Sequence, residues 1–126
     1  MHRDIRAENV LITLDINTLN YTAKLTNFKL SRSFEAATQN QSHSLEQIRY
    51  CAPELLKRAP NFKYNNKCEV YSFGILLWEI SEGKTPYEEH EDIVRITELV
   101  CNRNREPFSE NSQIPEKFKN LVFDGT

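Results

Sequence analysis

The sequence predicts an α+β fold that is mainly helical and carries one small β-hairpin. Near the amino terminus, two short runs rich in β-branched and apolar residues flank a turn-like stretch, which predicts a hairpin. After residue 51, apolar residues recur at helical spacing in four successive segments. At 126 residues the chain fits one compact domain and is too short for two well-cored ones.

The predicted hairpin comprises residues 9–14 and 21–28, with the sequences NVLITL and YTAKLTNF. The joining stretch, DINTLN, supplies Asp and Asn, which tolerate turn geometry. From Lys29 to about Arg49 the chain is rich in Ser, Thr, Gln and Asn and shows little periodicity. We therefore expect a long, mobile loop, a feature that is uncommon in compact domains unless it is functional or disordered.

Two helices are expected directly after this loop. Residues 52–58 place Pro53 in a first helical turn with Glu54 close behind it, as helix N-termini favour. Residues 67–83 carry apolar side chains on nearly every face, including that of Trp78, which is typical of a buried helix. Gly83 is a natural residue for the end of this helix.

Two amphipathic helices follow. The first lies within EDIVRITELVCN, where one apolar stripe is formed by Ile93, Ile96, Leu99 and Val100. The second begins at Pro115, and its side chains expected to face inward are Phe118, Leu121 and Val122. We interpret the first of these helices as a surface helix that could also contact a partner.

Composition and charge narrow the functional classes. Hydrophobic residues make up 39% and charged residues 27%, as in ordinary globular proteins. With 16 Lys and Arg against 18 Asp and Glu, the net charge of -2 predicts neither a nucleic-acid nor a membrane surface. Cys51, Cys68 and Cys101 show no metal-type spacing and are typical of reduced thiols. No signal peptide or membrane-spanning stretch is visible, so we expect a cytoplasmic or nuclear protein.

Four short segments, in order and at matching separations, resemble the carboxy-terminal lobe of the protein kinase superfamily. HRDIRAEN (2–9) is similar to the catalytic loop, and NFK (27–29) stands where the family has D-F-G. APE (52–54) is similar to the end of the activation segment, so residues 29–51 correspond to that segment. EVYSFGILLWEI (69–80) resembles the central buried helix. The resemblance implies a partial protein kinase domain over residues 1–126.

The resemblance also implies roles for individual residues, with ATP and Mg²⁺ as the family's cofactors. Asp4 would accept the proton of a substrate hydroxyl, and Arg6 would lie near the transferring phosphate, as in tyrosine kinases. Asn9 would lend its side-chain oxygen to a magnesium ion. Leu11 would form part of the floor under the adenine ring. Outside this context, Asp4 and Asn9 would be interpreted as turn residues.

Further residues match structural positions of the family's motifs. They are His2, Arg3, Phe28, Ala52, Pro53, Glu54, Glu69 and Gly74. The resemblance implies a contact between His2 and Phe28, although a histidine taken alone is more often a packed or surface residue. Arg3 would pair with a phosphorylated activation segment. Glu69 stands where the family usually has aspartate.

Asn27 departs from the family at the position of the metal-binding aspartate. An amide offers one neutral oxygen and cannot supply the anion that balances a dication, so we expect a weakened metal site at Asn9 and Asn27. Losing one preorganised charge contact typically costs about 10²-fold in turnover. Lys29 replaces a glycine, and its ammonium group could partly substitute for metal charge. The pattern is typical of a pseudokinase.

Several side chains of the activation segment are candidate phosphorylation sites: Ser33, Thr38, Ser42, Ser44 and Tyr50. For any one of them, a solvated polar loop residue is the simpler interpretation. Cys51 could be reactive, but a buried thiol is the simpler interpretation there too.

No Gly-rich loop or ATP-anchoring lysine is recognisable, so we expect the amino-terminal lobe to be absent from the chain and Glu54 to lack its arginine partner. Apolar surface would then be exposed and would favour association. Three hypotheses remain open. The chain is a segment of a tyrosine-kinase-like enzyme acting on protein Ser, Thr or Tyr, a non-catalytic signalling or binding module, or a truncated product without independent function. NFK and the central helix also resemble mixed lineage kinase domain-like pseudokinases, whereas the intact HRD departs from them.

Overall fold

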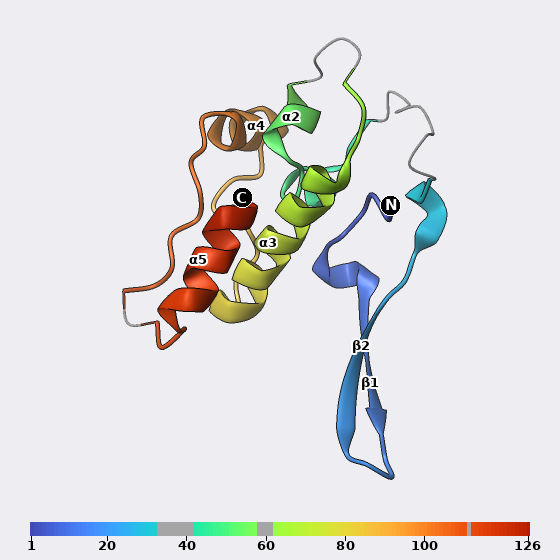
Figure 1. The fold of residues 1–126 in the computed structure, drawn as a ribbon. Coiled ribbons are helices and arrows are strands. Elements are labelled where there is room, and N and C mark those ends of the chain that lie inside the picture. Colours follow the sequence, from blue (N-terminus) through green and yellow to red (C-terminus); the bar gives the residue numbers. More distant parts are fainter. Residues whose placement is uncertain (33–41, 58–61, 111) are drawn as a thin grey trace.

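The computed structural model describes residues 1–32, 42–57, 62–110 and 112–126. Helices form one body, and a two-stranded hairpin extends away from it (Figure 1). The strands are β1 (Val10–Asp15) and β2 (Asn20–Leu25). In the described ranges the α-helices are α1 (Leu45–Ile48), α2 (Pro53–Leu56), α3 (Asn66–Glu82), α4 (Ile93–Cys101) and α5 (Glu116–Gly125). This is the predicted α+β architecture.

The hairpin forms where the sequence predicts it. Its antiparallel register runs from the pair Val10 and Leu25 to the pair Asp15 and Asn20. At the turn, the Asp15 carboxylate accepts the backbone N–H of Asn17 at 2.9 Å. These local bonds hold the pKa of Asp15 below its ordinary value and fix the chain reversal.

Helix α3 crosses the centre of the helical body. Its first turn is capped by Asn65, whose side chain accepts the backbone N–H groups of Lys67 and Cys68. Its end is Gly83, in the left-handed conformation (φ 64°) that glycine adopts without steric cost. Along its length α3 packs against α5, while α4 packs against α1 and α2 (Figure 1).

The core lies between α3, α4 and the segment that precedes α2. Ile96 and Val100 of α4 are completely buried, so these two members of the predicted apolar stripe face the core, whereas Ile93 at the start of the stripe is exposed. The other buried members of the cluster are Ile48, Tyr50, Ala52, Tyr64, Cys68, Tyr71, Ile75 and Tyr87. Trp78 is also buried and donates its indole N–H to the Pro107 carbonyl oxygen at 3.2 Å.

Three sequence-based expectations need correction. Residues 45–48, expected in a loop, form helix α1 because Ser44 and Gln47 close a capping box around this single turn. Helix α3 is not buried all round, since one side of it, with Val70, Phe73 and Ile80, is exposed. In α5, Val122 is buried as expected, but Leu121 is exposed.

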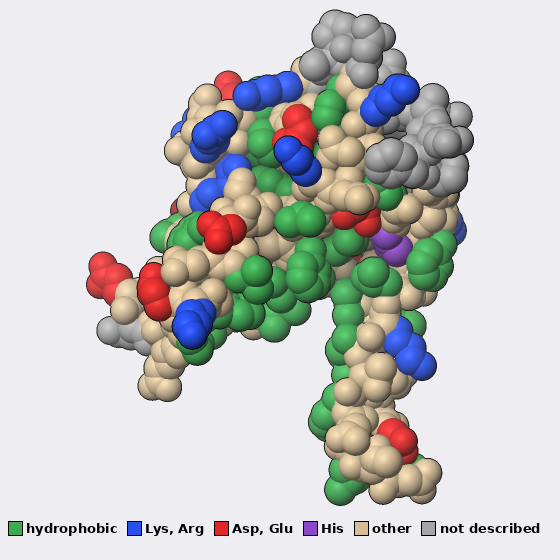
Figure 2. Space-filling model, viewed as in Figure 1, with side chains coloured by type: hydrophobic (Ala, Val, Ile, Leu, Met, Phe, Trp, Pro, Cys, Tyr) green, Lys and Arg blue, Asp and Glu red, His purple; other side chains and the backbone are tan. Residues whose placement is uncertain are grey.

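Exposed apolar side chains gather on the hairpin and on the lower part of the helical body (Figure 2). Directly paired residues of an antiparallel sheet share one face. One hairpin face is therefore wholly apolar and carries Val10, Ile12, Leu14, Tyr21, Ala23 and Leu25. Within the described part of the chain, none of the helices has the length and apolar content needed to cross a bilayer.

The cysteines are free thiols, as their spacing indicates. Burial raises the pKa of Cys51 to about 12 and that of Cys68 to about 11. Both thiols are therefore protonated near neutral pH, and neither has the thiolate character of a reactive cysteine.

Candidate functional site

A single carboxylate holds residues 2–4 against the start of α3. The Glu69 carboxylate accepts the backbone N–H of Arg3 at 2.7 Å and that of His2 at 3.1 Å. Tyr64 donates its hydroxyl to the same carboxylate at 2.9 Å. Arg3 has left-handed backbone angles (φ 70°), which cost a non-glycine residue free energy and persist only where surrounding bonds fix them. Glu69 supplies two of those bonds.

His2 connects this loop with the end of the hairpin. Its Nδ1 accepts the backbone N–H of Asp4 at 3.3 Å, so the ring proton lies on Nε2 and is donated to the Thr26 carbonyl oxygen at 2.7 Å. The ring also contacts Phe28 edge-to-face, with centroids 5.1 Å apart. The structure thus brings together the two rings that the motifs pair.

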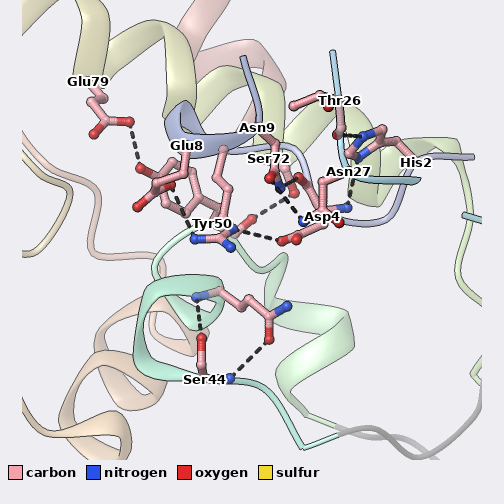
Figure 3. A network of polar contacts seen from close by, with 12 residues as sticks. His2, Asp4, Glu8, Asn9, Thr26, Asn27, Ser44, Tyr50, Ser72 and Glu79 are labelled. Carbon is pink, nitrogen blue, oxygen red and sulfur yellow. Dashed lines mark hydrogen bonds and ion pairs between the residues drawn. The ribbon is translucent and has the colours of Figure 1, made fainter. Parts of the chain in front are cut away.

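Asp4 bonds to Arg6 through its carboxylate and to Asn9 through its backbone carbonyl oxygen; Asp4 and Asn9 lie side by side in Figure 3. Asp4 Oδ1 accepts Arg6 Nε at 3.0 Å, and Arg6 also reaches Glu8, with 3.3 Å between Nη1 and Oε2. The Asp4 side chain is only 6% exposed. The guanidinium group keeps this buried carboxylate paired and fixes its orientation.

Asn9 and Asn27 bond to each other through their side-chain amides (Figure 3). Asn9 Nδ2 donates to the Asp4 carbonyl oxygen at 2.7 Å, and because only the amide nitrogen can donate to a carbonyl, Asn9 Oδ1 must face Asn27. That oxygen accepts Asn27 Nδ2 at 3.1 Å. This pairing assigns the orientation of both amides, and one lone pair of the Asn9 oxygen that was expected to bind a metal accepts an N–H donor.

Asn27 occupies a position with a strong backbone requirement. Its φ and ψ are 63° and 65°, in the left-handed region where Asn and Asp are several-fold enriched over other side chains. The exchange between asparagine and aspartate therefore alters charge without altering backbone fit. Lys29 lies in the 3₁₀ turn Phe28–Leu30 and is exposed. Its backbone is not in the left-handed region that favours glycine, so the lysine side chain causes no backbone strain there.

Leu11 lies on β1 opposite Lys24, on the more polar face of the hairpin, and is 53% exposed. Its expected place under an adenine ring stays a prediction. No group of three or more His, Cys, Asp or Glu side chains among the described residues is arranged to hold a metal ion.

The APE segment forms the start of α2. Ala52 is buried and precedes the helix, and Pro53 occupies its first turn. The Glu54 carboxylate accepts the Cys68 thiol at 3.7 Å, and within the described ranges it forms no ion pair. Gly74 lies where α3 and α5 approach closely, since a Cβ there would come within 2.7 Å of the Thr126 side chain.

Two residues before APE have structural roles that motif comparison missed. The buried Arg49 guanidinium donates to the carbonyl oxygens of Pro86 at 2.6 Å and His90 at 2.9 Å, and to that of Tyr87. Tyr50 donates its hydroxyl to Glu79 at 2.6 Å, and its carbonyl oxygen accepts the Ser72 hydroxyl at 2.8 Å. In a sequence, a polar residue that stands next to a strongly apolar segment could indicate a buried side chain whose hydrogen bonds hold that segment in place.

These contacts also bear on the candidate phosphorylation sites. Tyr50 is 4% exposed, so its hydroxyl is inaccessible in this conformation and the interpretation of Tyr50 as a modification site is not supported. Ser42 and Ser44 are exposed. Ser33 and Thr38 lie outside the described residues.

Changing Glu79 to glutamine is expected to make stability less sensitive to pH. Burial raises the pKa of the Glu79 carboxyl above its ordinary value of 4.5. The folded state therefore binds this proton more tightly than the unfolded state, and the stabilisation is complete below pH 4.5 and lost as pH rises through the folded-state pKa. Urea denaturation from pH 4 to pH 8 should show the stability of wild type relative to Glu79→Gln falling with rising pH. A constant difference would contradict this assignment.

The family assignment follows from a comparison of the whole chain. A model of the protein tyrosine and serine/threonine kinase family matches residues 1–124. The chain belongs to this family. The described fold, with its helices and two-stranded hairpin, is that of a kinase-like carboxy-terminal lobe, as the motifs predict.

Individual relatives show the same relationship. A probable LIM domain-containing serine/threonine-protein kinase from Dictyostelium discoideum is 43% identical over 88 residues, which cover 70% of this chain and 12% of the relative. The dual specificity protein kinase shkD from the same organism is 32% identical, covering 85% of this chain and 13% of the relative. Mouse mixed lineage kinase domain-like protein is 33% identical, and the match covers 97% of this chain and 25% of the relative. The chain thus spans a quarter or less of each of these relatives.

Proposed function

We propose that this kinase-domain segment is of the pseudokinase type and serves a signalling or binding role in place of metal-dependent phosphoryl transfer. The observation that supports it most is the hydrogen bond from Asn27 Nδ2 to Asn9 Oδ1, 3.1 Å long. Protein kinases hold Mg²⁺ with the D-F-G aspartate and the catalytic-loop asparagine. Here one candidate ligand is neutral and the other is already engaged.

The residues present do not fit a magnesium ion. Mg²⁺ demands near-octahedral oxygen ligands and is usually bound through one or two carboxylates. The remaining carboxylate of the loop, Asp4, is paired with Arg6 at 3.0 Å. A cation at Asn9 would share that oxygen with the Asn27 amide donor, and Asn27 would supply no anionic ligand.

Catalytic phosphorylation of protein Ser, Thr or Tyr, with ATP as donor, is the second candidate. It is favoured by the arrangement of the catalytic-loop residues, in which Arg6 binds the Asp4 carboxylate and Asn9 donates to the Asp4 backbone carbonyl oxygen. The relatives named as serine/threonine and dual specificity kinases point the same way. We rank catalytic phosphorylation below the pseudokinase role. The catalytic loop can position a substrate hydroxyl, but turnover also needs anionic ligands that balance the charge of the metal ion.

A protein partner, in the cytoplasm or nucleus, suits this function better than nucleic acid or a membrane, because the net charge is only -2. The apolar hairpin face and the exposed side of α3 are the surfaces through which we expect such association.

Asn27→Asp is expected to create a divalent-cation site that the wild-type chain lacks. The substitution removes the donor that occupies Asn9 Oδ1 and places a carboxylate in its position, so two acceptors then face each other and a cation relieves their repulsion. Mn²⁺, a paramagnetic substitute for Mg²⁺, should broaden the NMR signals of Asn9 and Asp4 in the variant at roughly 100-fold lower concentration than in wild type, from one added charge contact.

Asn102→Asp, at the exposed end of α4, adds the same charge outside the site and should behave as wild type does. If the wild-type protein binds Mn²⁺ at Asn9 as tightly as the Asn27→Asp variant does, the metal site is intact and the catalytic function is the better supported of the two. If neither protein binds, the defect extends beyond Asn27, and the pseudokinase proposal loses its stated cause.

A further inference from the structure

The chain around the end of β2 carries positive charge only. Between Ile16 and Arg32 the sequence contains Lys24, Lys29 and Arg32 but no aspartate or glutamate. All three side chains are exposed, and within the described ranges none of them forms an ion pair. Exposed lysines and arginines are ordinary surface residues, so their meaning depends on the groups that lie beside them.

Lys29 lies next to the pair of amides at the candidate site. It follows Asn27 by two residues, and Asn27 is bonded to Asn9 (Figure 3). Arg32 Nη1 donates to the Lys29 carbonyl oxygen at 3.2 Å, which keeps a second cation close to Lys29. The backbone bond from Thr26 N–H to the Asn9 carbonyl oxygen, 2.9 Å long, fixes this segment against the catalytic loop.

The neighbouring carboxylates are engaged elsewhere. Asp4 and Glu8 both pair with Arg6, at 3.0 and 3.3 Å. Asp15 lies in the turn at the far end of the hairpin, where it accepts local backbone N–H groups. Among the described residues, no carboxylate therefore forms an ion pair with Lys29 or Arg32.

The two departures from D-F-G change the charge of the segment in the same direction. Asn27 removes a negative charge and Lys29 adds a positive one. In active kinases, metal ions bridge the phosphate oxygens and neutralise their charge. A lysine ammonium is a point charge that binds phosphate oxygens directly. The segment that attracts a cation in the family therefore attracts an anion in this chain.

We propose that the segment Asn27–Lys29 binds a polyphosphate group without a metal ion. Lys29 supplies the main contact, and Arg32 adds positive charge beside it. The Asn27 amide uses one N–H for Asn9 and has a second to donate to a phosphate oxygen. The inference rests on the proposed function, because it names the ligand class of the same site. The group can belong to an inorganic polyphosphate or to a nucleoside triphosphate.

NMR titration of the intact chain with inorganic tripolyphosphate in EDTA tests the inference. The amide signals of Asn27 and Lys29 should shift saturably. Lys29→Ala should raise the dissociation constant roughly tenfold, as expected for the loss of one hydrogen bond to a charged group. Lys29→Arg keeps the charge and should bind nearly as wild type does. Lys84→Ala removes an exposed lysine beyond the end of α3 and should change nothing.

A parallel titration with ATP in EDTA separates the two sources of the group. Equal affinity identifies the polyphosphate as the recognised group, and tighter binding of ATP adds the nucleoside to it. The proposal is overturned if no saturable shift occurs, if Lys29→Ala binds as wild type does, or if Lys84→Ala loses as much affinity as Lys29→Ala. Affinity that rises when Mg²⁺ replaces EDTA would also overturn it, because the phosphate would then be bound through a metal.

This test and the test of the proposed function can fail separately. The Lys29 comparison contains no metal ion, whereas the Mn²⁺ comparison of wild type with Asn27→Asp contains no phosphate. A wild-type chain that binds neither Mn²⁺ nor tripolyphosphate would overturn the polyphosphate site and leave the missing metal site in place.

Discussion

Replacing Glu69 by alanine is expected to lower the free energy of unfolding by about 2–3 kcal/mol, as losing the charged acceptor of part-buried hydrogen bonds typically does. The carboxylate accepts two backbone N–H groups and the Tyr64 hydroxyl. Alanine leaves these donors without their acceptor, and Arg3 then keeps its left-handed backbone without the bonds that stabilise it. Urea denaturation followed by far-ultraviolet circular dichroism measures the change.

Two matched variants separate this role from general effects of charge. Glu69→Asp keeps the carboxylate on a side chain one methylene shorter and should lose clearly less stability than alanine. Glu98→Ala removes a carboxylate whose ion pair with Arg95 is exposed, and such pairs contribute about 0–1 kcal/mol. If Glu69→Ala cost no more than Glu98→Ala, the loop would be held by other contacts and the role assigned to Glu69 would be wrong.

The hairpin and the end of α3 could be predicted because their causes are local. Asp15 bonds to N–H groups two and three residues ahead, and Gly83 ends a helix by its own backbone freedom. The single turn of α1 was missed because its surroundings are polar and lack periodicity. Only the pairing of Ser44 with Gln47 makes this turn, and the same residue types occur in many loops.

The site could be predicted as a set of positions but not as a geometry. The motifs single out Asn9 and Asn27, which are 18 residues apart, yet a bond between their amides depends on how the hairpin returns the chain. The side chains of Arg49 and Tyr50 bind partners 29 to 41 residues away, which no local pattern indicates. Long-range polar contacts therefore set the local chemistry of the site, and the sequence alone leaves them open.

Ile96→Asp is expected to abolish cooperative folding, whereas Ile93→Asp should change stability by less than about 0.5 kcal/mol. The apolar stripe of α4 had suggested both residues as a partner surface, but Ile96 is 0% exposed and Ile93 is 41% exposed. A carboxylate at position 96 would enter the core without a counter-charge, at a cost comparable to the whole stability of a domain. Thermal unfolding followed by circular dichroism should show a transition for Ile93→Asp only.

The contrast decides how a partner surface on α4 can be tested. Loss of a partner in Ile96→Asp would report only unfolding, so it carries no information about contact. Ile93→Asp combined with Val94→Asp, which is 63% exposed in wild type, changes the surface while the buried pair Ile96 and Val100 keeps the helix in place. A folded double variant that still binds its partner would remove α4 from the interface and leave the apolar hairpin face and the exposed side of α3 as the surfaces to test next.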